Sequence, residues 1–233
     1  MAQQDVQKQE TAAWRQQEAQ KQASEDHEGE AMKKNTILCI GRQFGSGGRS
    51  IGKKIAAELS IPYYDKDILS KALQETDLPA DLLEKSDERL PNPMFRPVFY
   101  EGSNPRFYGK TSSEILFALQ KDFILQKAKE SSCVFVGRCA DAILEKEHDL
   151  NVISVFIAAS MEDRIERVMK RENIGERAAS EMIRRTDKQR KSYYGFFTDK
   201  DWGKPSDYDM VINSSDWSEE EIIKILKNLY EMK

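Results

Sequence analysis

The hydrophobic pattern divides the chain into a polar N-terminal stretch and a longer region in which short apolar runs alternate with amphipathic segments. The apolar runs are rich in β-branched and aromatic residues, which is typical of strands. They are TILCIG (36–41), IPYYD (61–65), CVFVG (133–137), VISVFIA (152–158) and DMVIN (209–213). Because continuous apolar runs suit strands that are buried on both faces, we expect these five to form a parallel sheet.

Amphipathic segments occupy the intervals between the runs. Ile51, Ile55 and Leu59 recur at every fourth position after the first run, so they share one face of a predicted helix. Further helices are predicted at 66–85 with a break at Pro79, at 113–130, at 160–172, at 176–192 and from Ser218 onwards, and an irregular excursion is predicted at 86–111. Strands that alternate with helices predict an α/β fold, with a parallel sheet of about five strands flanked by helices.

Residues 1–34 differ from the rest of the chain in composition. They are rich in Gln, Glu, Ala and Lys, and Trp14 is their only aromatic residue. Such a segment cannot bury enough apolar surface to fold alone. We therefore expect a flexible or helical polar tail at 1–34 and a folded domain at 35–233, and the sequence does not identify a partner for the tail.

Overall composition narrows the class of protein. The chain of 233 residues has a formal net charge of −4, whereas nucleic-acid-binding domains are usually basic, so we expect no nucleic-acid partner. Cys39, Cys133 and Cys139 lie in or beside apolar runs without paired spacing, which favours buried, reduced thiols. No apolar run approaches the ~20 residues of a membrane span, and the N-terminus lacks the apolar centre of a signal peptide. We therefore expect a cytoplasmic protein with no membrane contact.

A glycine-rich segment, GRQFGSGGRS at 41–50, follows the first predicted strand and precedes the first predicted helix. Glycines permit backbone conformations in which successive N–H groups point at an anion, and the N-terminus of a helix favours negative charge. This context predicts a phosphate-binding loop for ATP. The predicted ATP-binding residues are Gly45, Ser46, Gly47, Gly48, Arg49 and Ser50.

Two residues of this loop carry specific chemistry. Arg49 stands where phosphate loops usually have the lysine that contacts the β- and γ-phosphates, and Ser50 stands where a hydroxyl can ligate Mg²⁺. The glycine spacing is longer than the usual one, and arginine replaces lysine. Two alternatives are therefore open: a plain glycine turn, and a dinucleotide-binding loop for which Asp65 would supply the acidic residue at the end of the second strand.

The segment that begins at Gly41, GRQFGSGGRSIGKKIAAELSIPYYDKDIL, resembles the cytidylate kinase-like family of P-loop kinases. FVGRCADAIL, TDKQRKSYY and WGKPSDYDMVINSS are also similar to that family, so the resemblance spans residues 36–230. It implies a P-loop kinase fold with an acceptor-binding excursion at 66–131 and a lid at 173–200. It further implies a transferase that uses ATP and Mg²⁺ to phosphorylate a small-molecule nucleotide. CMP and dCMP are the acceptors that the resemblance favours most.

Turns after the second and third predicted strands are candidate acceptor sites. Asp65 follows the second strand, and the resemblance implies that it lies near the acceptor phosphate and Mg²⁺. Arg138 and Asp141 follow the third strand, which we expect beside the first, and the guanidinium fork of Arg138 suits an acceptor phosphate. Bacterial cytidylate kinases carry Gly-Arg-Asp here, with the aspartate linked to the sugar. Cys139 takes that place in this chain, which predicts a looser grip on the sugar.

The charged segment IRRTDKQRKSYY contains Arg184, Asp187 and Arg190 at spacings that place them on one helix face. The resemblance implies that they belong to the lid, and that Arg184 and Arg190 act with Arg49 by neutralising charge on the transferring phosphoryl group. A solvated helix face is the alternative.

Two alternatives concern the whole chain. A kinase for another small anionic metabolite is favoured by Cys139 and by the irregular excursion. A nucleotide-binding regulatory protein without turnover is favoured by the substituted loop lysine and the long tail.

Deletion of residues 1–34 tests the predicted boundary. We expect ATP affinity and the melting temperature to stay nearly unchanged, because this segment has little apolar surface to bury. Thermal unfolding and ATP titration of the truncated and full-length chains measure both quantities. A large drop in melting temperature on truncation would show that the tail docks on the folded domain.

Overall fold

The computed structural model describes residues 34–66, 99–101 and 104–233. Three predictions lie wholly or mostly outside these residues, namely the polar tail at 1–34, the helix at 66–85 and the irregular segment at 86–111. Residues Asn35–Lys233 form one compact unit. The description below concerns that unit.

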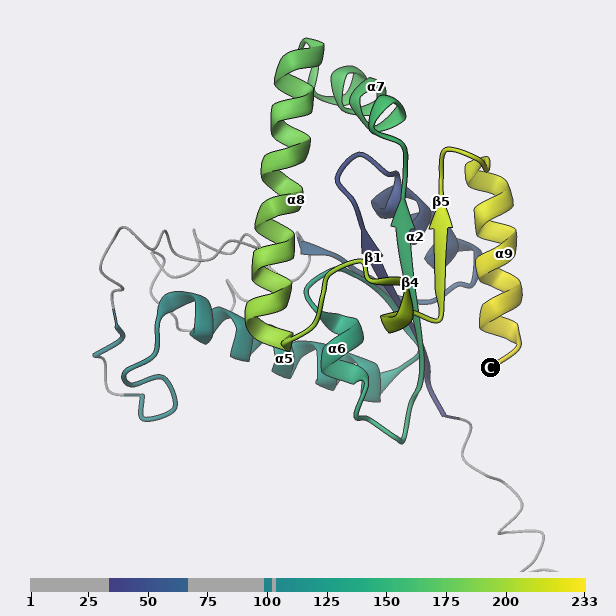
Figure 1. The fold of residues 1–233 in the computed structure, drawn as a ribbon. Coiled ribbons are helices and arrows are strands. Elements are labelled where there is room, and N and C mark those ends of the chain that lie inside the picture. Colours follow the sequence, from purple (N-terminus) through teal and green to yellow (C-terminus); the bar gives the residue numbers. More distant parts are fainter. Residues whose placement is uncertain (1–33, 67–98, 102–103) are drawn as a thin grey trace, which may run out of the picture. The chain divides into compact units, whose positions relative to one another are not determined.

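A parallel sheet of five strands lies at its centre (Figure 1). The strands are β1 (Thr36–Arg42), β2 (Tyr63–Tyr64), β3 (Cys133–Val136), β4 (Asn151–Ala158) and β5 (Met210–Asn213), in the order β2-β3-β1-β4-β5. Every neighbouring pair is parallel, which confirms the predicted α/β sheet. Because β3 lies beside β1, the loop after β1 and the turn after β3 open at the same edge of the sheet.

Helices connect and cover these strands. They are α2 (Gly48–Glu58), α5 (Ser112–Glu130), α6 (Ala140–Leu144), α7 (Met161–Glu172), α8 (Glu176–Thr198) and α9 (Glu219–Glu231), with a short 3₁₀ turn, η1, at Pro205–Asp207. Ser218 and Glu221 form the capping box that starts α9, and the Ser160 hydroxyl accepts from the Asp163 N–H at the start of α7. Among the described residues, none of these helices combines the length and apolarity needed to cross a membrane.

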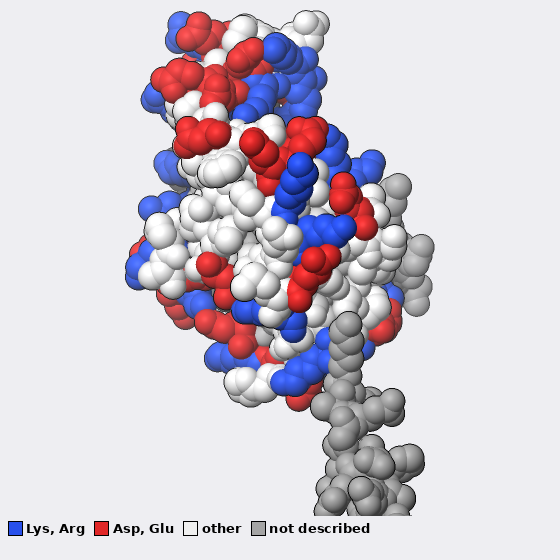
Figure 2. All heavy atoms as spheres, turned by 90° about the vertical axis from the view of Figure 1, so that its right-hand side faces the viewer, with Lys and Arg blue, Asp and Glu red and all other residues white. Residues whose placement is uncertain are grey.

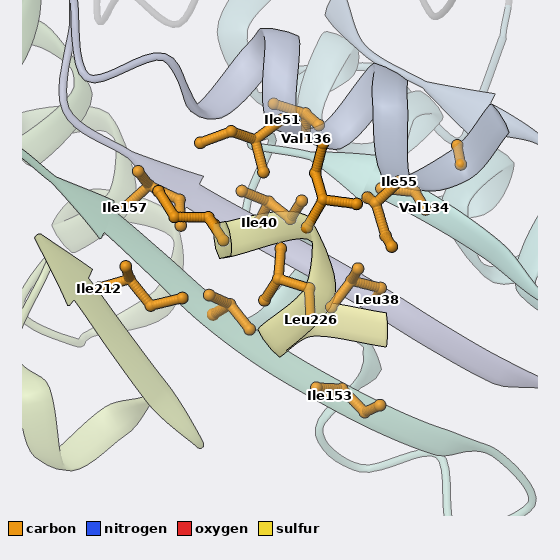
Figure 3. Packing of buried hydrophobic residues seen from close by; sticks show 14 residues of the cluster. Leu38, Ile40, Ile51, Ile55, Val134, Val136, Ile153, Ile157, Ile212 and Leu226 are labelled. Atoms are coloured by element: carbon orange, nitrogen blue, oxygen red, sulfur yellow. The ribbon is translucent and has the colours of Figure 1, made fainter. Parts of the chain in front are cut away.

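Both faces of the sheet are buried, which explains the continuous apolar runs. Leu38 and Ile40 of β1 point to the face that α2 and α9 cover (Figure 3), whereas Ile37 and Cys39 point to the face that α5 and α6 cover. All three cysteines are buried free thiols, as predicted. The result is a layer of helices on each side of a central sheet.

The contact between α2 and the sheet requires a glycine at position 52. A Cβ atom added to Gly52 would lie 2.6 Å from the Cγ2 atom of Val136, in the middle of the buried layer. We therefore expect Gly52→Ala to lower the free energy of unfolding by about 1–3 kcal/mol through overpacking. Urea denaturation measures this change. The matched control is Glu58→Ala at an exposed position of the same helix, and equal stability of the two variants would contradict the packing argument.

Candidate active site

A cavity of about 820 Å³ opens between the loop after β1, the start of α2, the end of β2 and the helices α7 and α8. Its volume lies within the range of nucleotide-sized ligand pockets. Its charge is one-sided, because five arginines and two lysines line it against two carboxylates. The basic residues are Arg42, Arg49, Lys53, Lys66, Arg167, Arg171 and Arg190. Such a cavity suits a polyanion.

The loop from Gln43 to Gly47 forms one wall of this cavity. Gly45 and Gly47 both have φ of +82°, a left-handed conformation that favours glycine. A Cβ atom on Gly45 would also lie 2.9 Å from the carbonyl oxygen of Arg164. Gly47 precedes the first residue of α2 and supplies no side chain to cap it, so the N–H groups of the first turn are left to a ligand.

The loop carbonyls are held by donors on the side chains of this and other elements. The Ser46 hydroxyl donates to Gln43 O (2.9 Å), Arg164 Nε to Phe44 O (2.8 Å), Arg167 Nη1 to Gly45 O (3.3 Å) and the Ser214 hydroxyl to Ser46 O (2.7 Å). Four successive carbonyl groups are thus satisfied within the protein. This arrangement fixes the loop conformation before any ligand arrives.

An ion pair between Arg164 and Asp187 holds the peptide groups of Phe44. Arg164 Nε donates to the Phe44 carbonyl, and the Phe44 N–H donates to Asp187 Oδ1 at 2.8 Å. The two side chains also pair with each other, and they are only 5% and 19% exposed. Asp187, predicted in the lid, therefore contacts the phosphate loop, and it ties α8 to α7 there.

Arg49 and Asp65 meet at the rim of the cavity. Arg49 Nε donates to Asp65 Oδ2 at 2.8 Å, and the Tyr63 hydroxyl donates to the same oxygen at 3.0 Å. Asp65 is buried, whereas the Arg49 side chain is 58% exposed. Burial and the neighbouring Asp65 carboxylate raise the pKa of Tyr63, so its hydroxyl remains a donor at neutral pH.

Ser50 lies on the first turn of α2 and lines the same cavity. Burial raises the pKa of Glu219, but hydrogen bonds from Lys54 and Ser50 outweigh it and hold the pKa below its ordinary value. Within the part of the chain that the structure describes, no three Asp, Glu, His or Cys side chains gather to hold a metal ion. A Mg²⁺ ion here would take most of its ligands from phosphates and water.

The turn after β3 adopts an unusual backbone conformation. Gly137, Arg138 and Cys139 have φ of +80°, +60° and +58°, so three successive residues are left-handed. Arg138 and Cys139 are both 4% exposed. Arg138 and Asp141 line a small cavity of about 20 Å³ beside the large one. The structure thus brings these two predicted acceptor residues to the sheet edge that carries the phosphate loop.

The Asp141 carboxylate contacts α8. The Tyr194 hydroxyl donates to Asp141 Oδ2 at 2.7 Å, and burial raises the pKa of this carboxyl group. Cys139 packs against Tyr193 and Tyr194 in the same region. The turn after β3 and the start of α6 are therefore fastened to the helix that also carries Asp187.

The two arginines predicted in the lid, Arg184 and Arg190, lie in different environments. Arg190 lines both cavities, its Nη1 donates to the Arg42 carbonyl at 3.2 Å, and its guanidinium lies 5.6 Å from the centre of the Phe44 ring. Arg171 lies 4.7 Å from the same ring. Arg184 is exposed and lines neither the large nor the small cavity.

The surface around Arg184 is densely charged. Figure 2 shows side chains of both signs interleaved at the end of the molecule that α7 and the start of α8 form. Lys170 pairs with Glu166 at 2.6 Å and Arg177 with Glu181 at 3.2 Å, and all four are exposed. Pairs of this kind contribute little to stability.

The sequence analysis missed Arg42. This residue ends β1 and is 8% exposed, and it lines both the large and the small cavity. An arginine at the carboxyl end of the central strand, just before the glycines, is a signal that could have identified it, because ligands of α/β proteins bind at that edge.

Comparisons with known proteins agree with this geometry. The Cytidylate kinase-like family matches residues 37–216. A cytidylate kinase from Methanocaldococcus jannaschii is 33% identical over 193 residues, which cover 82% of this chain and 96% of that enzyme. A cytidylate kinase from Methanopyrus kandleri is 33% identical over 108 residues, which cover 44% of this chain and 56% of that enzyme.

A solved structure is also similar. It is that of an uncharacterized protein from Eubacterium ventriosum, with a TM-score of 0.66 and 27% sequence identity. The match covers 85% of this chain and all of the other. Because the family match spans most of the chain and the phosphate loop lies within it, the chain belongs to the cytidylate kinase-like family and is an ATP-dependent kinase.

Proposed function

We propose that this kinase transfers the γ-phosphate of ATP to CMP or dCMP. The observation that carries the proposal is the pairing of β1 with β3, which places the phosphate loop and the Arg138 turn side by side at one sheet edge. A donor phosphate and an acceptor phosphate bound to these two segments would meet there. The two named relatives are cytidylate kinases, which supports a pyrimidine monophosphate as the acceptor.

The donor side of the site comprises the loop and the start of α2. The N–H groups of residues 45–50 hold the ATP phosphates, and Arg49 lies at the cavity rim, near where the γ-phosphate would bind. Ser50, with phosphate oxygens and water, would hold Mg²⁺, which neutralises charge on the phosphates when bound. Arg190 reaches the same cavity from α8, whereas Arg184 needs a movement of the α7–α8 hairpin to approach it.

The acceptor side comprises the Arg138 turn and Asp65. The side chains of Tyr64, Phe123 and Phe135 adjoin both residues around a space of only about 10 Å³, so a base would have to lie outside this space. Asp141 acts through Tyr194 in this arrangement, so it positions the turn and does not hold the sugar. Because Cys139 also offers no carboxylate, ribose and deoxyribose acceptors should be used with similar efficiency.

A second candidate function is a kinase for another small anionic metabolite. The observation that favours it is the chemistry of the turn after β3. Cys139 has no carboxylate and the Asp141 carboxylate accepts from Tyr194, so neither is available to bind a sugar. The basic cavity would accept any acceptor that carries a phosphate or a carboxylate.

A panel of nucleoside monophosphates with ATP, with ADP release as the readout, tests the proposal. We expect CMP and dCMP to be the best acceptors, followed by UMP. If no monophosphate raises ADP release above the ATPase background, the metabolite kinase or a regulatory protein without turnover should replace the proposed function.

Arg49→Ala tests the donor side. Losing one charged contact to the transferring phosphate typically lowers kcat about 100- to 1,000-fold, and the exposed Arg49 side chain should leave the fold intact when it is removed. Steady-state kinetics and thermal unfolding measure the two effects. The control is Arg177→Ala on the exposed side of α8, which should behave as wild type. An unchanged kcat in Arg49→Ala would contradict its assigned role.

Arg138→Ala tests the acceptor side. We expect the KM for the acceptor to rise far more than the KM for ATP, because in this proposal the Arg138 turn binds the acceptor and the phosphate loop binds ATP. Thermal unfolding must accompany the kinetics, since Arg138 is 4% exposed. Acceptor kinetics equal to those of wild type would place the acceptor pocket elsewhere.

A further inference from the structure

The side chain of Arg42 crosses from the phosphate loop to the acceptor turn. A Cβ atom on Gly48 would lie 2.6 Å from the Cβ atom of Arg42, and a Cβ atom on Gly137 would lie 2.6 Å from its Cζ atom. Any side chain at either position would therefore displace Arg42. Gly48 is the first residue of α2, directly after the phosphate loop, and Gly137 begins the turn after β3, so the arginine runs from one segment to the other.

The position of the guanidinium also places it between the two cavities. Arg42 and Arg190 are the residues that line both the large cavity and the small one with Arg138 and Asp141, among the residues described. The Arg190 guanidinium donates to the Arg42 carbonyl at 3.2 Å, which holds the two arginines together. Arg42 pairs with Ile157 in the register of β1 and β4, so its backbone is anchored in the centre of the sheet.

Burial distinguishes Arg42 from the arginine that the loop motif indicates. The Arg49 side chain is more than half exposed, and its Nε donates to Asp65. Arg42 is 8% exposed and its side chain is confined by two glycines, so its guanidinium loses little freedom when it binds a ligand. The planar fork of arginine can contact two phosphate groups at once.

We propose that Arg42 is a further catalytic residue, whose guanidinium contacts the phosphoryl group as it passes from ATP to the acceptor. The inference rests on the proposed function, in that the acceptor group is a phosphate. In the transfer, a bond forms between an acceptor phosphate oxygen and the γ-phosphorus, and the bond from that phosphorus to the β–γ bridging oxygen breaks. ADP leaves with the electron pair. With an ionised acceptor phosphate, no proton is released or consumed.

The guanidinium donates hydrogen bonds to the oxygens of the phosphoryl group, where negative charge is shared between donor and acceptor in the transition state. It acts as a hydrogen-bond donor and a positive charge, and it takes no part as an acid or a base. Its contribution is therefore larger in the transition state than in either binary complex.

The test compares wild type with Arg42→Met, which keeps an unbranched apolar stem and removes the guanidinium and its charge, and with Arg42→Lys. We expect kcat to fall about 100- to 1,000-fold in Arg42→Met, with partial recovery in Arg42→Lys, while the KM for ATP and the KM for the acceptor each change less than about 10-fold. Arg177→Met is the control for loss of a surface charge.

A second measurement separates this role from a structural one. The probe is a bisubstrate analogue in which adenosine and cytidine are joined by five phosphates. Arg42→Met should weaken binding of the analogue more than binding of ATP or of CMP alone. Only the analogue has phosphates that run from the ATP site to the acceptor site, past the Arg42 guanidinium. Equal losses for all three ligands, or a kcat within about 3-fold of wild type in Arg42→Met, would overturn the proposal.

The folded state of the variant is checked by thermal unfolding and by ATP titration. If Arg42→Met does not fold, Arg42→Lys decides by the same comparison of ligands. Failure of the proposed function would appear in wild type, as an acceptor panel without response to CMP. Failure of the present inference would appear only in the variant, as a kcat close to that of wild type when both are measured with the acceptor that wild type uses.

Discussion

The ion pair of Arg164 and Asp187 around the Phe44 peptide is the constraint on which the rest of the site depends. A loop that turns its N–H groups toward a ligand must find other partners for its carbonyls, and each unsatisfied buried group costs about 1–3 kcal/mol. Arg164 and Asp187 satisfy both backbone polar groups of one residue, Phe44, and they neutralise each other's charge. Burial of such a pair without those partners would be costly. The loop therefore fixes where α7 and α8 lie.

The same helices bring positive charge to the cavity. Arg167 and Arg171 project from α7 and Arg190 from α8, and the Phe44 ring lies close to the last two guanidinium groups. A triphosphate bound on the loop would thus contact side chains that the loop itself positions. A ligand that favours one arrangement of the loop would therefore also favour the matching arrangement of α7 and α8.

The fold was predictable because both faces of the sheet are buried, so that each strand appears as a continuous apolar run. The five-residue α6 was not predictable, because it is too short to show a helical period. The helix α8 continues past its predicted end at 192 to Thr198, where Tyr193 and Phe197 pack with Phe117 of α5. Site residues directly after strands were predictable from parallel topology. The path of Arg42 was not, because it depends on space beside two glycines that are distant in sequence.

One face of α8 contacts both the phosphate loop and the turn after β3. Asp187, Arg190 and Tyr194 follow one another at spacings of three and four residues, so they share that face. They contact the Phe44 N–H, the Arg42 carbonyl and the carboxylate after the acceptor turn, respectively. The left-handed residues of that turn other than glycine each cost about 1–2 kcal/mol, so the turn persists only while its packing against Tyr193 and Tyr194 holds it. The helix α8 thereby contacts both the phosphate loop and the turn after β3, so a shift of α8 would change the positions of both.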